Sequence, residues 1–192
     1  MRTKLPNFGY QLHFTSGEIE TAVQSPQEIR QLLHSLYGAR TTTPDRQVAF
    51  SAADGVNLAL LPSLGKTRLL SDEEMDYYVQ EYARHGIHGP LNWYRTREVN
   101  YVDELEAFFA DGKNPKATPL VEQEVLFVLA KKDQALKPFM AERMGERIPN
   151  FTRKEVDAGH WALWERPEEI NKMIGDWLEE KVFAKQGVKS KL

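Results

Sequence analysis

The sequence predicts an α/β protein, with a helical N-terminal region followed by a short β-α-β-α portion of a parallel sheet. The first 112 residues carry amphipathic helix patterns and no long apolar run. After the breaks at Asp111-Gly112 and Asn114-Pro115, two strand-like segments, Val125–Ala130 and Phe151–Val156, alternate with helical ones. This order is typical of a parallel sheet with crossover helices. We therefore expect a helical region over 1–112, a sheet region over 113–184 and a tail over 185–192.

The first helix of the N-terminal region is predicted to begin after Ser25. Serine suits the position before a helix, Pro26 suits its first turn, and Glu28 can complete a capping box. One apolar face then follows at the spacing of a helix, and Gly38 ends it. The residues of this face are Ile29, Leu32, Leu33 and Leu36.

Two further helices are predicted in this region. Ser71 and Glu74 form a second capping box, and an apolar stripe continues from them as far as Gly86. A third helix opens at Pro90, and its expected inward positions are Leu91, Tyr94, Val102, Leu105 and Phe108. The aromatic run over 8–14 is expected to be an ordered loop. Residues 39–70 are so poorly patterned that they are either a functional loop or a misread region.

The sheet region has a sharper pattern. The run Val125–Ala130 is apolar throughout, as in a strand that is buried on both faces. A short helix is expected over 138–144. A longer amphipathic helix is expected over 167–181, with Ile170, Met173, Ile174, Trp177 and Leu178 on one side.

Composition excludes several classes of function. The chain has 192 residues, no cysteine and a formal net charge of -3, so it has neither thiolate metal sites nor the basic excess of a nucleic-acid-binding protein. No apolar run is long enough to span a membrane, and the N-terminus lacks the apolar core of a signal peptide. No histidine or carboxylate group has the spacing of a metal site, and no cofactor is expected.

Two residues follow the predicted strands closely enough to share a site. Asp133 lies just after the first strand and His160 just after the second. The ends of parallel neighbours meet at the same edge of a sheet, where catalytic loops of α/β proteins lie. An aspartate that accepts a hydrogen bond from a histidine fixes its tautomer and makes it a competent general base. Spacing alone also fits a turn aspartate and a packed histidine.

Four segments in a fixed order extend this hypothesis. They are Tyr10-Gln11-Leu12, then Gly89-Pro90-Leu91-Asn92-Trp93-Tyr94-Arg95, then Asp133 after an apolar strand, and then Gly159-His160-Trp161. In these segments the chain resembles soluble epoxide hydrolases of the α/β-hydrolase superfamily, and the resemblance extends over roughly residues 5–180. The resemblance implies that residues 1–112 form a helical cap (lid) and residues 113–184 the C-terminal portion of the hydrolase core.

The resemblance also implies roles for individual residues. In that family an aspartate nucleophile opens the epoxide and forms an ester, and a histidine oriented by an acid activates the water that cleaves it. Carried over, Tyr10 and Tyr94 bind the oxygen of a small apolar epoxide, His160 is the general base and Asp133 orients it. Trp93 and Trp161 neighbour these residues and are candidates for substrate binding.

The family's nucleophile is not found in the sequence. Neither Gly-x-Asp-x-Gly nor Gly-x-Ser-x-Gly occurs, and Asp54-Gly55, the nearest fragment, lacks the first glycine. The oxyanion-hole segment is also missing. We therefore expect an incomplete α/β-hydrolase fold that is inactive or weakly active without an N-terminal half.

Two alternatives remain open. One is a non-catalytic pseudoenzyme that associates with itself or with a partner, because an unpaired apolar strand invites another chain. The other is a different capped hydrolase such as a dehalogenase, against which the two tyrosines argue.

The last three residues, Ser190-Lys191-Leu192, match the signal that the peroxisomal import receptor reads at a C-terminus. The sequence therefore predicts a peroxisomal location, with the cytoplasm as the alternative.

Overall fold

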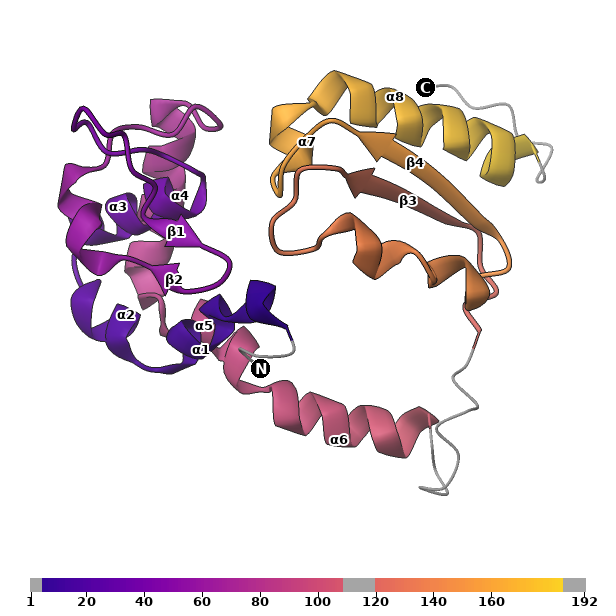
Figure 1. Cartoon of the computed structure of the whole chain (residues 1–192), viewed down its shortest axis with the longest axis horizontal. Helices are drawn as coiled ribbons and strands as arrows, with labels where there is room; N and C mark the ends of the chain where they lie inside the picture. Colours follow the sequence, from indigo (N-terminus) through magenta and orange to yellow (C-terminus); the bar gives the residue numbers. More distant parts are fainter. Residues whose placement is uncertain (1–4, 109–119, 185–192) are drawn as a thin grey trace. The chain divides into compact units, whose positions relative to one another are not determined.

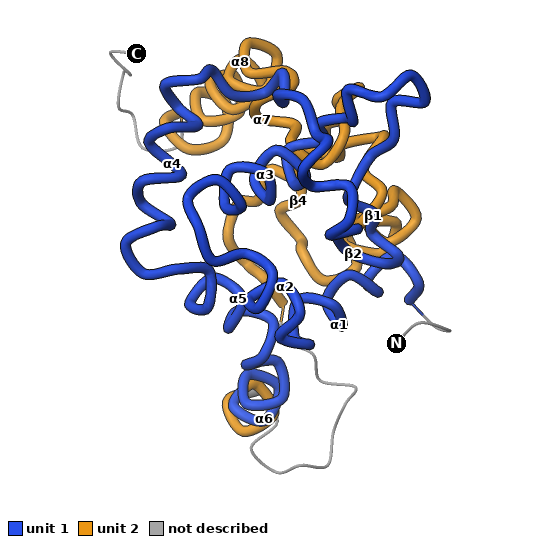
Figure 2. The backbone as a smooth tube through the Cα atoms, turned by 90° about the vertical axis from the view of Figure 1, so that its left-hand side faces the viewer, with its two compact units in different colours: residues 1–103 blue, residues 104–192 orange. Residues whose placement is uncertain are grey.

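The computed structural model of the protein describes residues 5–108 and 120–184 (Figure 1). The chain forms two compact units, residues 1–103 and 104–192, which Figure 2 colours separately. They divide inside helix α6 (Arg97–Phe108). The boundary expected after residue 112 lies outside the described residues, as does the predicted signal over 190–192.

Two helices of the first unit confirm the predicted capping boxes. Helix α3 (Pro26–Leu36) begins at Ser25, whose hydroxyl accepts a hydrogen bond from the backbone N–H of Glu28. Helix α4 (Asp72–His85) begins in the same way at Ser71 and is followed by Gly86, which has a φ of 69°. The positive φ turns the chain away from the helix at little cost because glycine has no Cβ.

The segment over 8–14 is a correction, because it is helical and not a loop. A 3₁₀ turn, η1 (Pro6–Phe8), leads into α1 (Tyr10–Thr15), and α2 (Glu18–Ala22) follows. The backbone N–H of Tyr10 donates to the carbonyl of Ala52, and a Cβ on Gly9 would lie 1.8 Å from the carbonyl oxygen of Ala53. Contacts with a turn that is distant in the sequence therefore stabilise this helix, and no local sequence pattern predicts these contacts.

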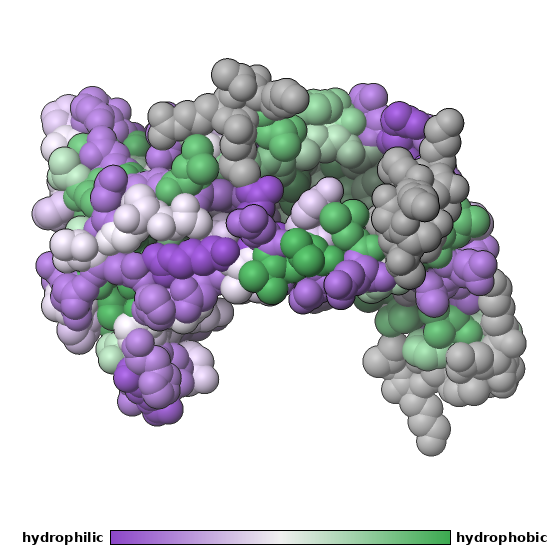
Figure 3. Space-filling view, turned by 90° about the horizontal axis from the view of Figure 1, so that it is seen from below, coloured by the Kyte–Doolittle hydropathy of each residue, from purple (hydrophilic) through white to green (hydrophobic). Residues whose placement is uncertain are grey.

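The third predicted helix is also corrected, because it is two helices. Helix α5 (His88–Arg95) is followed by its C-cap residue Thr96, and α6 starts directly after it. Of the expected inward positions, Leu91 is buried and Tyr94 is half-buried, but Val102 and Leu105 are exposed. The prediction that Val102 and Leu105 face inward is therefore wrong, because the side chains of α6 have little packed over them. Figure 3 shows apolar residues at the surface on the face that it presents.

Residues 39–70 are structured, so the alternative that this region was misread is the correct one. Strands β1 (Phe50–Ser51) and β2 (Gly55–Val56) form an antiparallel hairpin, and the 3₁₀ helix η2 (Leu58–Ser63) follows. Isolated bridges join Arg40 to Val48 and Thr41 to Leu64. Strands of two residues are too short to show a period of two, which explains why the pattern was missed.

The core of the first unit lies between these short elements. Its fully buried side chains include Ile19 from α2 and Met75 from α4. The predicted face of α3 contributes Ile29, Leu32 and Leu33, which are also buried. The core of this unit is thus built by side chains from α2, α3 and α4.

The second unit contains the predicted parallel pair. Strand β3 (Val125–Ala130) pairs with β4 (Phe151–Val156) in one register that sets Val125 opposite Phe151 and Ala130 opposite Val156. Helix α7 (Ala162–Glu165) precedes α8 (Pro167–Trp177), which continues as the π-helix η5 (Leu178–Phe183). The predicted strand order and the C-terminal helix are therefore confirmed.

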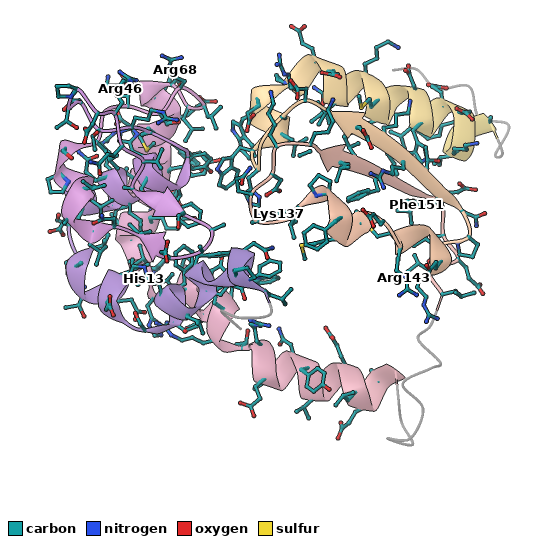
Figure 4. All side chains as sticks on the ribbon, in the orientation of Figure 1. His13, Arg46, Arg68, Lys137, Arg143 and Phe151 are labelled. Atoms are coloured by element: carbon teal, nitrogen blue, oxygen red, sulfur yellow. The ribbon has the colours of Figure 1, made fainter. Side chains whose placement is uncertain are left out.

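The two faces of this sheet carry different apolar contacts. On one face Val156, Ala158 and Ile170 form a buried cluster, against which Val128 and Ala130 of β3 pack. On the other face the rings of Phe127 and Phe151 stack with their centroids 6.0 Å apart, and Figure 4 labels Phe151 on β4. The prediction that β3 is buried on both faces is wrong, because Leu129 alone among its residues is buried and the others are half-buried.

The segment over 138–144 contains 3₁₀ turns and not the single short helix that was expected. They are η3 (Pro138–Ala141) and η4 (Met144–Glu146). Within the described residues, no helix combines the length and the apolar character that crossing a membrane requires. The same residues contain no group of three or more metal-ligating side chains.

Candidate active site

The loops after β3 and β4 run side by side. Two backbone hydrogen bonds join them, from the N–H of Lys131 to the carbonyl of Val156 and from the N–H of Lys132 to the carbonyl of Ala158. These bonds continue the parallel pairing beyond the last residues of the strands. They bring the residue that follows each loop, Asp133 or His160, to the same sheet edge.

Asp133 and His160 are in direct contact. Nδ1 of His160 lies 2.9 Å from Oδ2 of Asp133. The other oxygen, Oδ1, accepts hydrogen bonds from the backbone N–H groups of Ala135 (2.8 Å) and Leu136 (2.9 Å). The carboxylate is therefore fixed by its own loop and presents its second oxygen to the imidazole.

Hydrogen bonding keeps this carboxylate ionised. Burial would raise the pKa of Asp133, but the backbone N–H of Leu136, the imidazole of His160 and the N–H of Ala135 together lower that pKa below its usual value. An ionised carboxylate only accepts hydrogen bonds, so Nδ1 of His160 carries the proton and donates it.

The imidazole of His160 is much more exposed than the carboxylate of Asp133. The side chain is 51% exposed, whereas that of Asp133 is 7% exposed. Among the described residues, Nε2 of His160 has no hydrogen-bond partner. Because Nδ1 carries the proton in the neutral ring, Nε2 holds the lone pair that can take a proton from water.

The segment that carries His160 is tied to the helix that follows it. The carboxylate of Glu165 on α7 accepts a hydrogen bond from the backbone N–H of Gly159 at 2.8 Å. The ring of Trp161 meets the imidazole of His160 edge to face, with centroids 5.3 Å apart. Sequence reasoning missed Glu165, because a single carboxylate five residues after a histidine matches no rule of spacing.

The two tyrosines also meet, within the first unit. Tyr10 lies on α1 and Tyr94 on α5, and their ring centroids are 5.8 Å apart at an angle of 81°. Phe14 packs edge to face against both rings, at 5.3 Å from Tyr10 and 4.9 Å from Tyr94. An aromatic cluster thus holds two phenols next to each other, although 84 positions separate them in the sequence.

The hydroxyl of Tyr94 is well suited to donate. Burial, together with the neighbouring phenols of Tyr10 and Tyr82, raises the pKa of Tyr94 above its ordinary value. The hydroxyl therefore keeps its proton at neutral pH and can give it to an oxygen that gains negative charge.

A pocket of about 270 Å³ opens beside Tyr94. It is lined by Leu5, Phe8, Gln11, Trp93, Tyr94 and Arg97. The side chain of Trp93 is 77% exposed and forms part of this lining. The predicted substrate-binding residue Trp93 thus lies beside Tyr94, and Trp161 lies beside His160.

A second, larger pocket of about 490 Å³ contains His13, which Figure 4 labels on α1. Its Nδ1 accepts a hydrogen bond from the backbone N–H of Val56 at 3.1 Å, and its Nε2 lies 3.4 Å from a carboxylate oxygen of Glu18. Both ring nitrogens are thus engaged. His13 joins α1 to the β1-β2 hairpin and has no free lone pair for catalysis.

Comparison with known families decides how this arrangement is classified. A family model described as the alpha/beta hydrolase fold matches residues 12–167, most of the chain and parts of both units. The chain belongs to the α/β-hydrolase fold family. The predicted fold class is thereby confirmed, and Asp133 and His160 are parts of an α/β-hydrolase chain.

The relatives of this α/β-hydrolase chain are epoxide hydrolases. Epoxide hydrolase srdG of Neurospora crassa is 37% identical over 187 residues, which cover 91% of the chain and 51% of the relative. Bifunctional epoxide hydrolase 2 of Mus musculus is 31% identical and is covered over 31% of its length. The chain therefore spans about half of one relative and a third of the other.

Solved structures agree with this family. Epoxide hydrolase A from Mycobacterium thermoresistibile is 26% identical and superposes with a TM-score of 0.59, over 89% of the chain and 52% of that structure. The epoxide hydrolase VrEH1 from Vigna radiata has a TM-score of 0.67 at 19% identity, which speaks for the fold alone. It is covered over 55% of its length.

Proposed function

We propose that this chain contributes the histidine base and the oxygen-binding tyrosines of an epoxide hydrolase. The observation that carries the proposal is the pair His160–Asp133, in which a buried carboxylate fixes the imidazole and Nε2 stays accessible. The names of the relatives, which are epoxide hydrolases, supply the reaction class.

The tyrosines act in the opening of the epoxide. When a nucleophile attacks the ring carbon, negative charge develops on the oxygen that leaves it. The phenol hydroxyls of two neighbouring rings, Tyr10 and Tyr94, stabilise that charge and supply the proton that completes the alcohol. Their value is greatest in the transition state, where the charge is present, and small in the ground state.

The histidine acts in the second step. A carboxylate nucleophile that has opened the epoxide is left as an ester of the product. Nε2 of His160 takes a proton from water, the resulting hydroxide attacks the ester carbonyl, and Asp133 stabilises the imidazolium that forms. The ester C–O bond then breaks, and the departing alkoxide takes the imidazolium proton to complete the vicinal diol. The carboxylic acid that remains returns its proton to the tyrosinate, which regenerates the carboxylate and the phenol.

The nucleophile of this scheme needs a glycine-flanked elbow, and the 192 residues contain no Gly-x-Asp-x-Gly. We therefore propose that the chain alone does not turn over an epoxide and that a second polypeptide segment completes the site. The part of the Neurospora crassa relative that this chain does not match can be used to test this proposal.

The experiment measures diol formation from styrene oxide by the chain alone and by the chain fused to that segment. We expect no turnover by the chain alone, and turnover by the fusion that His160→Ala abolishes and His85→Ala leaves intact. His85 is the matched control because it is the last residue of α4 and has no part in the proposed site. Turnover by the chain alone that His160→Ala abolishes would refute the claim of inactivity, and a folded but inactive fusion would refute the proposed function.

A second function, the binding of another polypeptide strand, is favoured by the composition of the sheet. Strand β3 is apolar throughout, whereas β4 carries Arg153, Lys154 and Glu155, and in the described residues β3 has only β4 as a neighbour. An apolar edge is a template for pairing. Sedimentation velocity over a range of concentrations should show self-association, and a monodisperse monomer would contradict it.

A further inference from the structure

Helix α5, which carries Tyr94, is attached to the preceding helices in two chemically different ways. Apolar contact joins it to α1, where the ring of Tyr94 packs on Phe14. An ionic contact joins it to α2, where the carboxylate of Glu20 receives side chains from both ends of α5. The ionic contact has no role in the chemistry described above.

The geometry at Glu20 is specific. Arg95, the last residue of α5, donates from Nη2 to Oε2 at 2.6 Å and from Nη1 to Oε1 at 3.0 Å. His88, the first residue, places Nδ1 2.6 Å from the same Oε1. The guanidinium is itself held in plane by Asn92, whose side-chain oxygen accepts from Nη1 at 2.9 Å.

We propose that Glu20 is a positioning residue that sets the rotation of α5 and thereby holds the ring of Tyr94 against its partner Tyr10. Positions 88 and 95 are seven residues apart, so they lie on one face of the helix, two turns from each other. One carboxylate that binds both fixes this face toward α2. Tyr94, the neighbour of Arg95, then points about 100° away from it, toward α1.

The aromatic contact cannot do this alone. Edge-to-face ring contacts are worth little energy and tolerate sliding and rotation, whereas a bidentate hydrogen bond from arginine to a carboxylate has a fixed plane and direction. The side chains of Glu20 and Arg95 are only 23% and 25% exposed, so water competes for them less than for a surface pair. Hydrogen bonds from Arg95 and His88 also hold the pKa of Glu20 below its usual value, although burial opposes them.

The inference rests on the proposed function of Tyr94, and its test reads the ring directly. The full chain is labelled with 3-fluorotyrosine, and the ¹⁹F signal of Tyr94 is assigned with Tyr94→Phe. We expect Glu20→Ala to move that signal by more than its line width and to leave the signal of Tyr77, an exposed tyrosine of α4, in place. Asp76→Asn is the matched control, because Asp76 pairs with Arg30 to join two other helices of the same unit, α3 and α4.

A second variant covers the case in which Glu20→Ala does not fold. Arg95→Lys keeps the charge but loses the bidentate geometry, so it should displace the Tyr94 signal in the same direction to a smaller extent. A Tyr94 signal that stays in place in either folded variant would overturn the proposal.

The active fusion described above gives an independent readout. There we expect Glu20→Ala to lower kcat about tenfold with less change in KM, since misplaced donors lose their effect mainly in the transition state. An unchanged kcat would also overturn the proposal. If the fusion shows no turnover at all, the proposed function fails, and the fluorine signals still decide whether Glu20 positions Tyr94.

Discussion

Oδ2 of Asp133 and Nδ1 of His160 are 2.9 Å apart, and Oδ1 of the same carboxylate is occupied by two backbone N–H groups of its own loop. Because its own loop holds one carboxylate oxygen, the other oxygen of Asp133 is a rigid acceptor for His160. It also makes the consequences of substitution unusually specific, because an amide has one oxygen where a carboxylate has two.

Asp133→Asn should reverse the tautomer of His160. The amide oxygen of the new side chain will accept from Ala135 and Leu136, which leaves its NH₂ group facing the imidazole. Nδ1 must then accept, so the proton moves to Nε2 and the base is lost. Nitrogen chemical shifts of His160 report the tautomer, and diol formation in the active fusion should fall by roughly 10²- to 10⁴-fold. Retention of the Nδ1–H form in the variant would contradict the assignment.

Asp133 should also make the stability of the second unit depend on pH. Its pKa is lower in the folded protein than in the unfolded chain, so the stabilisation is complete above about pH 4 and is lost as the pH falls through the folded value. Urea unfolding of the wild type and of Asp133→Asn should therefore show a difference that shrinks as the pH falls below about 4. A difference that grows on acidification would reverse the sign and refute the hydrogen-bonding scheme.

Glu165→Ala should loosen the segment that carries His160. The variant removes the acceptor of the Gly159 N–H, so the backbone before His160 loses its tie to α7. We expect the Nδ1 proton of His160 to exchange faster with water, by NMR, while the fold persists. Glu168→Ala serves as control, because Glu168 is also a glutamate but lies in the first turn of α8, outside this loop. Equal exchange rates in the two variants would show that the tie has no such role.

Gly55 and Gly17 offer a matched test of how the hairpin is joined to α1. Both have a positive φ, of 90° and 87°, but a Cβ on Gly55 would lie 2.6 Å from Nδ1 of His13, whereas a Cβ on Gly17 would meet nothing within 4 Å. Gly17→Ala should cost about 1–2 kcal/mol, the price of the left-handed backbone alone. Gly55→Ala should destabilise the protein more, by urea unfolding, and also displace His13.

A double variant separates the two contributions at Gly55. In a His13→Gly background, which removes both the imidazole and the Cβ that would lie 2.8 Å from the added methyl group, the steric part of the Gly55→Ala effect should disappear, so that its cost approaches that of Gly17→Ala. An equal cost of Gly55→Ala with and without His13 would mean that the imidazole is not packed against the hairpin.

Much of this fold could be predicted from short sequence patterns. The capping boxes at Ser25 and Ser71 and the apolar strand Val125–Ala130 are signals that lie within a few residues of one another, and each appears where it was predicted. The helix α1 was missed because a turn some 40 residues away stabilises it. The contacts of Glu20 with His88 and Arg95 were missed for the same reason, since these partners are 68 and 75 positions away in the sequence.

The sequence by itself determined the motifs that resemble the family and the order of the elements. It also singled out Asp133, His160, Tyr10 and Tyr94. Only the tertiary structure decided which atoms meet: that Oδ2 and not Oδ1 of Asp133 receives His160, and that Tyr10 and Tyr94 share one aromatic cluster. The reason is physical. Helix caps and apolar periods depend on neighbours along the chain, whereas hydrogen-bond direction and ring contact depend on distances that only the folded backbone sets.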